Sequence, residues 1–260
     1  MFDLSGRTAF VTGSSRGVGR ALALALGKAG ANLVLHGLER DDFAEESIRL
    51  AEQLDVNVEF IAGDLSGPTN EDVLQFAEKV SERFPNIDLL VNNAGGYFDV
   101  PFLELAPATF EKTMRLNVFS YFLLSQWFAK RWVKNETAGR ILMIGSINGR
   151  LAEQTHVSYD TSKGAVEMMV KSMCVELAPL GIRVNGLAPG LFYTPLTAQA
   201  LDDPKEREWM ERHTPNGKVP DPDVAGAAAV FLLSDKADHV HGQMLLIDGG
   251  MSAWQQPPMP

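Results

Sequence analysis

Short apolar runs alternate with longer amphipathic stretches along almost the whole chain. Each apolar run is bounded by glycine, proline or polar residues, and each amphipathic stretch carries apolar residues at helical spacing. The pattern predicts strands over residues 8–12, 32–36, 56–62, 87–92, 140–144, 182–187 and 243–247. It predicts helices over residues 20–29, 42–54, 70–84, 110–133 (one helix or two), 157–180 and 223–233.

The predicted strands are mostly apolar and do not alternate between apolar and polar residues. Such strands are typical of a parallel sheet that helices cover on both faces. Since no linker or repeat divides the chain, residues 1–260 are predicted to form a single-domain α/β Rossmann fold with a doubly wound, parallel, seven-stranded sheet. The polar segment 191–217 is expected to form a lid over a substrate. The proline-rich tail, 252–260, is a poor helix or strand former, either frayed or laid across a neighbouring subunit.

Composition narrows the class of protein. The net charge is −10 and no run of lysine or arginine occurs, so no nucleic-acid partner is expected. The single cysteine, Cys174, lies in an apolar helical stretch and cannot form a disulfide within the chain, which favours the reducing cytoplasm. The N-terminus lacks the features of a signal peptide, and no apolar stretch reaches the ~18 residues of a membrane span, so no membrane partner is expected.

A glycine-rich turn, TGSSRGVG at residues 12–19, follows the first predicted strand and leads into the first helix. Gly13 permits a tight bend, Gly17 lets the backbone approach a pyrophosphate, and Gly19 lets the helix pack closely on the sheet. The N–H groups at the start of the helix then face the anion. The spacing differs from the GxGxxG fingerprint, but its position after the first strand of an alternating chain predicts a nucleotide site.

The residues after the second predicted strand bear on the choice of dinucleotide. An acidic residue there accepts a hydrogen bond from the ribose 2′-hydroxyl of NAD, but Gly37 stands at that position. Glu39 follows beside Arg40, and both also suit a solvated surface. Arg16, in the glycine turn, could pair with the 2′-phosphate of NADP. The predicted cofactor is therefore NAD or NADP, with a slight preference for NADP from Arg16 and Gly37.

Tyr159 and Lys163 are four residues apart in a predicted helix, which places them on one face, one turn apart. Tyrosine, with a pKa of about 10, is a poor base at neutral pH, but a neighbouring ammonium lowers that pKa. This spacing also occurs by chance on many helices. The context supports a site, because Ser146, NNAG at 92–95 and Pro189-Gly190 each follow a predicted parallel strand, where open α/β sheets bind ligands. The Ser146 hydroxyl can hold a substrate oxygen beside the tyrosine.

Together these motifs resemble the short-chain dehydrogenase/reductase family over essentially the whole chain. The resemblance implies that Tyr159 is the acid/base, and that Lys163 holds the nicotinamide ribose and lowers the tyrosine pKa. It implies that Ser146 orients the carbonyl and that Asn117 holds a water linking Lys163 to solvent. The motifs that carry it are TGSSRGVG at 12–19, GDL at 63–65, NNAG at 92–95, Asn117 in LNV, Ser146, YDTSK at 159–163, and Pro189-Gly190 with Thr194.

The resemblance also implies the cofactor-binding residues, and no metal site is expected. Asp64 and Leu65 would contact adenine, Asn92 and Gly95 would line the ribose site, and Thr194 would touch the carboxamide. The sequence departs from the family at Gly37-Leu38, which supplies neither the acidic residue of NAD-preferring members nor the arginine common in NADP-preferring ones. The implied set is Gly13, Ser15, Arg16, Gly17, Val18, Gly19, Gly37, Leu38, Asp64, Leu65, Asn92, Ala94, Gly95, Tyr159, Lys163, Pro189, Gly190, Phe192 and Thr194.

Polar residues expected near the tyrosine indicate a hydroxylated small-molecule substrate: a sugar, sugar acid or polyol. Segment 190–217 is similar to gluconate 5-dehydrogenase-like members of the family. One alternative is a 3-oxoacyl-(acyl carrier protein) reductase, although the sequence lacks a basic patch for such an acidic partner. A remoter alternative is a non-catalytic nucleotide-sensing protein. The candidate substrate residues are Tyr97, Asn148, Gln154, His156 and Tyr193.

The resemblance finally implies self-association, since family members are usually tetramers or dimers built on helices around 100–134 and 157–180. A homotetramer or homodimer is therefore expected. The methionines of the second segment, Met168, Met169 and Met173, suit an interface and a core equally well.

Overall fold

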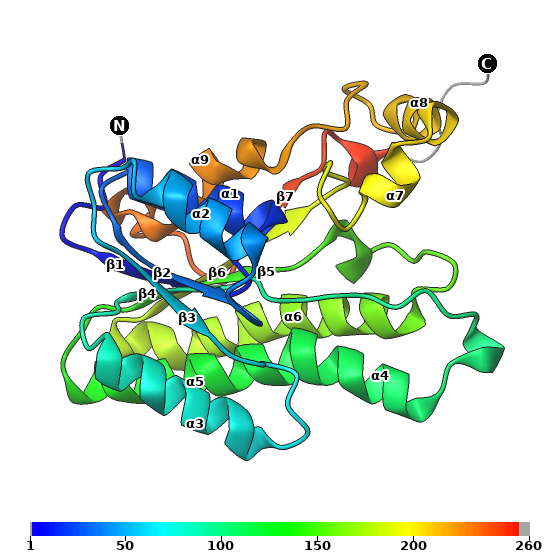
Figure 1. Ribbon diagram of the computed structural model, residues 1–260. Helices are drawn as coiled ribbons and strands as arrows, with labels where there is room; N and C mark the ends of the chain where they lie inside the picture. The colour runs from blue at the N-terminus through cyan, green and yellow to red at the C-terminus, as the bar shows by residue number, and fades with distance from the viewer. Residues whose placement is uncertain (1, 255–260) are drawn as a thin grey trace.

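Seven parallel strands form the centre of the protein in the order β3-β2-β1-β4-β5-β6-β7 (Figure 1). The computed structural model describes residues 2–254, so most of the predicted tail lies outside the described residues. The prediction of a doubly wound parallel sheet is confirmed. The strands are β1 (Thr8–Val11), β2 (Asn32–Gly37), β3 (Val58–Ala62), β4 (Leu89–Asn92), β5 (Arg140–Ile144), β6 (Arg183–Pro189) and β7 (Met244–Ile247).

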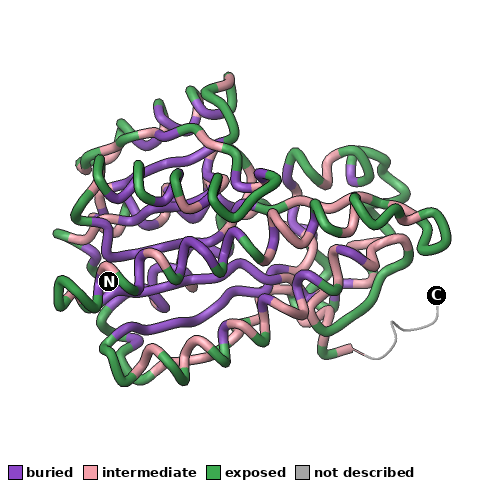
Figure 2. The backbone as a smooth tube through the Cα atoms, turned by 90° about the horizontal axis from the view of Figure 1, so that it is seen from below, coloured by how far each residue is buried: buried purple, intermediate pink, exposed green. Residues whose placement is uncertain are grey.

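Helices cover both faces of the sheet, and the strands between them are buried (Figures 1 and 2). Successive strand residues point to opposite faces: Phe10 packs into the core on the α3, α5 and α6 side, and Val11 into the core on the α1 and α9 side. The central strands are therefore apolar at most positions, whereas the edge strand β3 has exposed residues. The helices are α1 (Gly17–Lys28), α2 (Asp42–Ala51), α3 (Asn70–Arg83), α4 (Pro107–Met114), α5 (Ser120–Lys134), α6 (Val157–Leu177), α7 (Ala198–Leu201), α8 (Pro204–Arg212) and α9 (Gly226–Leu233).

Some element boundaries differ from the sequence prediction, each for a local reason. Helix α1 begins at Gly17, three residues earlier than predicted, because Arg16 is the extended N-cap residue. The predicted helix over 110–133 is two helices, α4 and α5, joined by a π-helical turn, Arg115–Phe119. The polar segment 191–217, for which no helix was predicted, contains α7 and α8, which lie together at one end of the molecule (Figure 1). Among the described helices none is long and apolar enough to cross a membrane.

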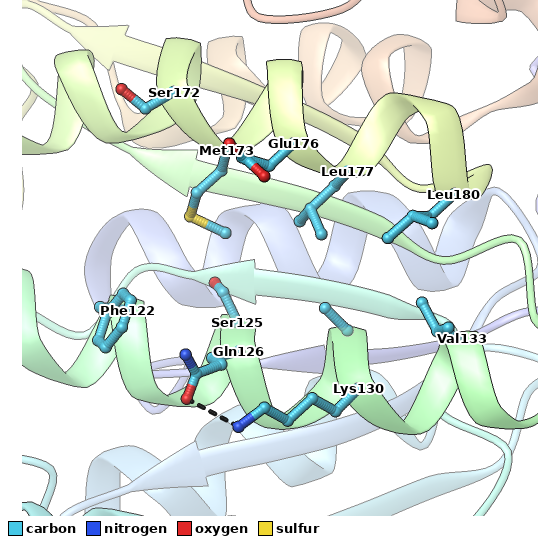
Figure 3. Close-up of a pocket in the computed structure, with 11 residues that line it drawn as sticks. Phe122, Ser125, Gln126, Lys130, Val133, Ser172, Met173, Glu176, Leu177 and Leu180 are labelled. Atoms are coloured by element: carbon cyan, nitrogen blue, oxygen red, sulfur yellow. Dashed lines mark hydrogen bonds between the residues drawn. The ribbon is translucent and has the colours of Figure 1, made fainter.

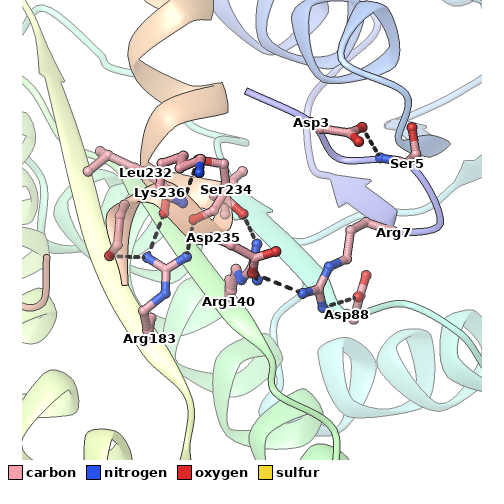
Figure 4. A network of polar contacts seen from close by, with 12 residues as sticks. Asp3, Ser5, Arg7, Asp88, Arg140, Arg183, Leu232, Ser234, Asp235 and Lys236 are labelled. Carbon is pink, nitrogen blue, oxygen red and sulfur yellow. Dashed lines mark hydrogen bonds and ion pairs between the residues drawn. The ribbon is translucent and has the colours of Figure 1, made fainter. Parts of the chain in front are cut away.

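A network of polar contacts, partly buried, joins the amino ends of the central strands (Figure 4). Arg7, before β1, pairs with Asp88, before β4, at 2.8 Å. Arg140, the first residue of β5, contacts Asp235, and Arg183, the first residue of β6, donates to three backbone carbonyls at and after the end of α9. These contacts occupy the amino ends of the strands. The opposite, carboxyl ends are free to carry a site. The strand order reverses between β1 and β4, which is where such folds bind ligands.

Candidate active site

The turn between β1 and α1 is built so closely that two of its positions admit only glycine. A Cβ on Gly13, whose φ is +63°, would lie 2.8 Å from the Cα of Ala94. A Cβ on Gly19 would collide with the carbonyl of Gly13. The turn therefore packs against the loop after β4, and the N–H groups at the start of α1 stay open to an anion.

His36, the penultimate residue of β2, holds this turn in place through hydrogen bonds of its ring. Its Nδ1 accepts a hydrogen bond from the Gly13 N–H at 2.9 Å, so the ring proton is on Nε2, which donates to the carbonyl of Gly63 at 3.1 Å. Burial lowers the pKa of His36 to about 4, so the ring is neutral. His36 was not among the residues predicted from the sequence; the available signal was a polar side chain following the apolar run Leu33–Leu35 of the strand.

The NNAG motif after β4 is held to the glycine turn by its second asparagine. The Asn93 side-chain amide donates to the carbonyls of Thr12 and Gly13 at 2.9 and 3.1 Å. The Asn92 amide instead donates to the Ser125 hydroxyl of α5 at 2.9 Å and is fully buried. The Asn92 side chain therefore links β4 to α5, and its place at the ribose site stays a prediction.

Asn117 lies in the π-helical turn between α4 and α5 and is fully buried. Its Nδ2 donates to the Gly96 carbonyl at 2.9 Å and to the Ser162 hydroxyl at 3.0 Å, while its Oδ1 accepts from the Gly96 N–H at 3.0 Å. A Cβ on Gly95 would lie 3.1 Å from that Oδ1 and 3.7 Å from Lys163 Nζ. The π turn, a feature common at functional sites, thus brings Asn117 beside Lys163.

Tyr159 and Lys163 lie one turn apart on α6, next to the residues that follow β5. Lys163 Nζ donates to the carbonyl of Ile144 at 2.9 Å and lies 5.6 Å from the centre of the Tyr159 ring. Ser146, two residues after Ile144, forms a side-chain hydrogen bond with Tyr159. The four residues predicted to be catalytic are therefore brought together, at the carboxyl ends of β4 and β5.

The protonation of this group differs from the sequence expectation. Burial raises the pKa of Tyr159 to about 12, against the hydrogen bond with Ser146, which lowers it. Burial lowers the pKa of Lys163 to about 8. The lowering of the tyrosine pKa expected from Lys163 is therefore not delivered by the protein alone, because removing both groups from water disfavours both of their charged forms.

Two of the predicted substrate residues pack directly on Tyr159. The ring centres of Tyr97 and His156 lie 5.7 and 6.0 Å from that of Tyr159. Asn148 Nδ2 donates to Oδ1 of Asp160, the residue after Tyr159, at 2.9 Å and so lies near the same group. The other two candidates are placed differently.

Gln154 is exposed, and the Tyr193 hydroxyl donates to Asp202 at 2.8 Å, within the segment that carries α7 and α8. Tyr193 therefore belongs to the predicted lid. Tyr97 connects this segment to Tyr159, since its hydroxyl donates to the Leu196 carbonyl at 3.3 Å and its ring packs on that of Tyr159.

The residues present fit a dinucleotide that lies along the carboxyl ends of the strands. Thr194 faces the glycine turn, since a Cβ on Gly17 would lie 3.7 Å from its side chain. Gly37 ends β2 where a side chain would be tightly placed, because a Cβ there would lie 3.2 Å from the Glu39 carbonyl oxygen and 3.3 Å from Ser15 and the Phe60 ring. Leu65 and Phe192 have their side chains in the core, so they offer a cofactor only their backbone.

A groove of about 540 Å³ lies between α5 and α6, away from Tyr159 (Figure 3). Its walls are largely apolar, and the one hydrogen bond drawn in the figure joins Lys130 to Gln126 along α5 at 3.1 Å. None of its lining residues belongs to the predicted catalytic or cofactor sets. The groove is lined by Phe122, Ser125, Gln126, Ala129, Lys130, Val133, Ser172, Met173, Glu176, Leu177 and Leu180.

Known proteins are similar to this chain over nearly its whole length. A family model described as enoyl-(acyl carrier protein) reductase matches residues 13–252. The L-rhamnose 1-dehydrogenase (NADP(+)) of Thermoplasma acidophilum is 37% identical over 96% of this chain and 98% of that protein. The 5-keto-D-gluconate 5-reductase of Escherichia coli is 34% identical over 96% and 97%. The crystal structure of a gluconate 5-dehydrogenase from Burkholderia cenocepacia, in complex with NADP and tartrate, superposes with a TM-score of 0.89 at 34% identity over 97% and 98%.

Proposed function

Because the chain belongs to the short-chain dehydrogenase/reductase family, we propose that it is an NAD(P)-dependent oxidoreductase that interconverts a hydroxyl and a carbonyl group on a sugar, sugar acid or polyol. The observation that carries the proposal is the meeting of Tyr159, Ser146, Lys163 and Asn117 at the carboxyl ends of two central strands. The substrate class is supported by relatives that are named for a sugar or a sugar acid and that match this chain over nearly their full length.

The chain's own residues would manage the proton and the substrate oxygen. A bound nicotinamide supplies the hydride in reduction and accepts it in oxidation. In oxidation the alcohol oxygen would lie between the Ser146 hydroxyl and the Tyr159 phenolate, and its proton would pass to the phenolate oxygen as the carbonyl forms. Lys163, held by the Ile144 carbonyl, presents its ammonium to the ribose and the tyrosine. Asn117, which holds Gly96 and Ser162, keeps a path by which the proton leaves toward solvent.

A substrate panel tests the function. Sugars, aldonates and polyols are offered with NAD and with NADP, and the absorbance of the reduced nicotinamide is followed. Turnover of polyhydroxy compounds supports the proposal. Turnover confined to acetoacetyl thioesters would instead identify a 3-oxoacyl-(acyl carrier protein) reductase, and cofactor binding without turnover of either class would identify a nucleotide-sensing protein.

NADP is the proposed cofactor of the two. Gly37 cannot supply a carboxylate against a 2′-phosphate, and the next residue, Leu38, is 68% exposed. Arg16 is exposed, forms no ion pair with any residue of 2–254, and lies 5.1 Å from the Phe43 ring centre, beside this strand end. Arg40 is less available because it pairs with Glu45 at 2.5 Å. An NADP complex of a relative adds support.

A homo-oligomer built on α5 and α6 is proposed from the apolar groove between them. Phe122 and Val133 on α5 and Val175 and Leu180 on and after α6 are between 43% and 75% exposed, which is a large apolar surface for a protein alone in water. A second copy of the chain would cover it. Light scattering should give a dimer or tetramer, and Val175→Asp should shift the population toward monomer. Residence in the cytoplasm is proposed from the single, half-buried Cys174.

Segment 191–217 is proposed to be the substrate lid. Its first part faces the glycine turn through Thr194. The Leu196 carbonyl accepts a hydrogen bond from Tyr97, a predicted substrate residue. It ends at Gly217, whose φ of +70° favours glycine and suits a hinge. Hydrogen exchange of this segment should slow when NADP and substrate are both present.

A further inference from the structure

Two segments that are far apart in the sequence meet beside Tyr159. The Val100 N–H donates to the Thr155 carbonyl at 3.1 Å. Thr155 has a φ of +65°, a left-handed conformation that is rare for a β-branched residue and that turns the chain into α6. His156 follows as the N-cap residue, with its ring 5.1 Å from that of Tyr97. This strained junction fixes the wall against which a substrate would lie.

That wall carries three carboxylates, Asp99, Glu153 and Asp160, which we call the acidic wall. His156 Nε2 lies 2.7 Å from Asp99 Oδ1, and its Nδ1 lies 3.3 Å from Glu153 Oε2. Asp160 accepts from the Glu153 N–H and from Asn148 Nδ2, both at 2.9 Å. The side chains of Asp99 and Glu153 are both 56% exposed, so they keep carboxylate oxygens accessible as hydrogen-bond acceptors.

The charge of the acidic wall reaches the residues that contact the substrate. Burial is the first cause of the raised pKa of Tyr159, and Asp160 and Glu153 raise it further. Burial is likewise the first cause of the raised pKa of Tyr97, followed by Asp99 and Glu153. A second negative charge placed beside Tyr159 would meet the same repulsion as the phenolate does.

The arginines of the neighbouring elements are already paired, so they do little to offset this charge. The Lys112 ammonium lies 5.1 Å from the centre of the Phe98 ring, and His156 is held between Asp99 and Glu153. The ion pairs of the arginines are Arg150 with Glu167 at 2.9 Å, Arg207 with Glu211 at 3.1 Å and Arg212 with Glu208 at 2.5 Å.

We propose that the substrate of this site is a neutral polyhydroxy compound, an aldose or a polyol, and that the acidic wall selects it over an aldonate. The inference rests on the proposed function and narrows its substrate class. Substrate hydroxyls donate hydrogen bonds to the open oxygens of Asp99 and Glu153, whereas a substrate carboxylate has no proton to donate and adds a like charge. The wall thus combines attraction for one class with repulsion of the other.

The test compares matched substrates that differ only at C1, such as L-sorbose with 5-keto-D-gluconate in reduction and D-glucitol with D-gluconate in oxidation. We expect kcat/KM to be about 10-fold higher for the neutral member of each accepted pair. The preference should narrow as salt is added, because the acidic wall is partly exposed.

Single-charge variants locate the effect. Glu153→Gln keeps the shape of the side chain and should raise the relative kcat/KM of the aldonate about 3- to 10-fold, and Asp99→Asn should act in the same direction. The matched control is Glu59→Gln, an exposed carboxylate on β3 that pairs with Arg83 and should leave the ratio unchanged.

The outcomes separate the two proposals. A higher kcat/KM for the aldonate members, or a ratio that neither variant moves, overturns the selection by the acidic wall and leaves the oxidoreductase function standing. Absence of turnover with every polyhydroxy compound, neutral or anionic, overturns the proposed function itself and the substrate inference with it.

Discussion

The Nδ1 atom of His36 accepts a hydrogen bond from the backbone N–H of Gly13 at 2.9 Å, inside the turn that follows β1. The other ring nitrogen reaches the carbonyl of Gly63, just after β3. Ser14 closes the link, since its hydroxyl accepts from the His36 N–H at 2.9 Å. One neutral ring therefore sets the distance between the turn proposed to hold the pyrophosphate and the loop proposed to face the adenine.

Replacing this ring by an apolar side chain should weaken both folding and cofactor binding. His36→Leu leaves the Gly13 N–H and the Gly63 carbonyl without a partner, and each such buried group costs roughly 1–3 kcal/mol. We expect a loss of about 2–4 kcal/mol in denaturant unfolding and an NADP Kd about 10-fold higher by fluorescence titration. His239→Leu, at an exposed histidine, is the control.

The same variant has a pH signature. The pKa of His36 is lowered to about 4, so between about 4 and its usual 6.5 the unfolded chain binds a proton that the folded protein refuses. The free energy of unfolding should therefore fall as pH decreases through this window, by roughly 3 kcal/mol in total. His36→Leu should lack this part of the slope. An unchanged slope and an unchanged NADP Kd would contradict the role given to the ring.

Lys163→Met should stabilise the cofactor-free protein while nearly abolishing activity. The pKa of Lys163 is lowered to about 8 by burial, so between pH 8 and the usual 10.5 the unfolded chain holds the extra proton and stability rises with pH. Below pH 8 the folded protein carries the cost of the buried charge. Removing the charge should raise Tm by a few degrees, worth about 1–2 kcal/mol, and lower kcat about 100-fold or more.

The control for that variant is Lys171→Met on the same helix. Lys171 is exposed and pairs with Glu167 at 3.2 Å, so its loss should change neither Tm nor kcat appreciably. A Tm lowered by Lys163→Met, measured in parallel, would show that the Lys163 ammonium stabilises the fold and would refute the prediction.

Ser146→Ala should move the pH profile of the oxidation reaction. The hydrogen bond from Ser146 lowers the pKa of Tyr159, so its loss raises that pKa further and leaves less phenolate at any given pH. Oxidation needs the phenolate, so its rate should rise at more alkaline pH than in the parent enzyme, with kcat near neutrality lower by about 100-fold. Ser146→Thr keeps the hydroxyl and should recover most of the parent profile. Equal loss in both variants would point to packing.

Arg16→Ala should separate the two cofactors. If its guanidinium pairs with the 2′-phosphate, kcat/KM for NADP should fall about 10- to 100-fold while that for NAD changes less than about 3-fold. Arg49→Ala, an exposed arginine of α2 paired with Glu46, is the control. Equal losses with both cofactors would place Arg16 at the turn and not at the phosphate.

The arrangement of strands followed from the apolar pattern because the central strands are buried on both faces of the sheet and are therefore mostly apolar. The positions of some boundaries did not, because they depend on the backbone around them. Arg16 is extended and lets α1 begin within the glycine turn. The predicted lid folds into α7 and α8, whose residues are mostly exposed and so carry little apolar periodicity.

The catalytic group was predictable because its members stand at fixed places relative to strands and one helix. Contacts that join distant segments were not predictable from spacing. Asn93 and not Asn92 holds the glycine turn, since the two neighbours point in opposite directions from the end of β4. His36 and the carboxylates of Asp99 and Glu153 gain their roles only when the chain folds, through partners far away in the sequence.

Tyr159→Phe tests the central claim most directly, because it removes one oxygen and keeps the ring that packs on Tyr97 and His156. The measurement is the rate of nicotinamide reduction in a single turnover with the best substrate, alongside the NADP Kd of the same preparation. We predict a rate about 1,000-fold lower with a Kd within about 2-fold of the parent value. A rate close to that of the parent enzyme would contradict the assignment of the proton transfer to Tyr159.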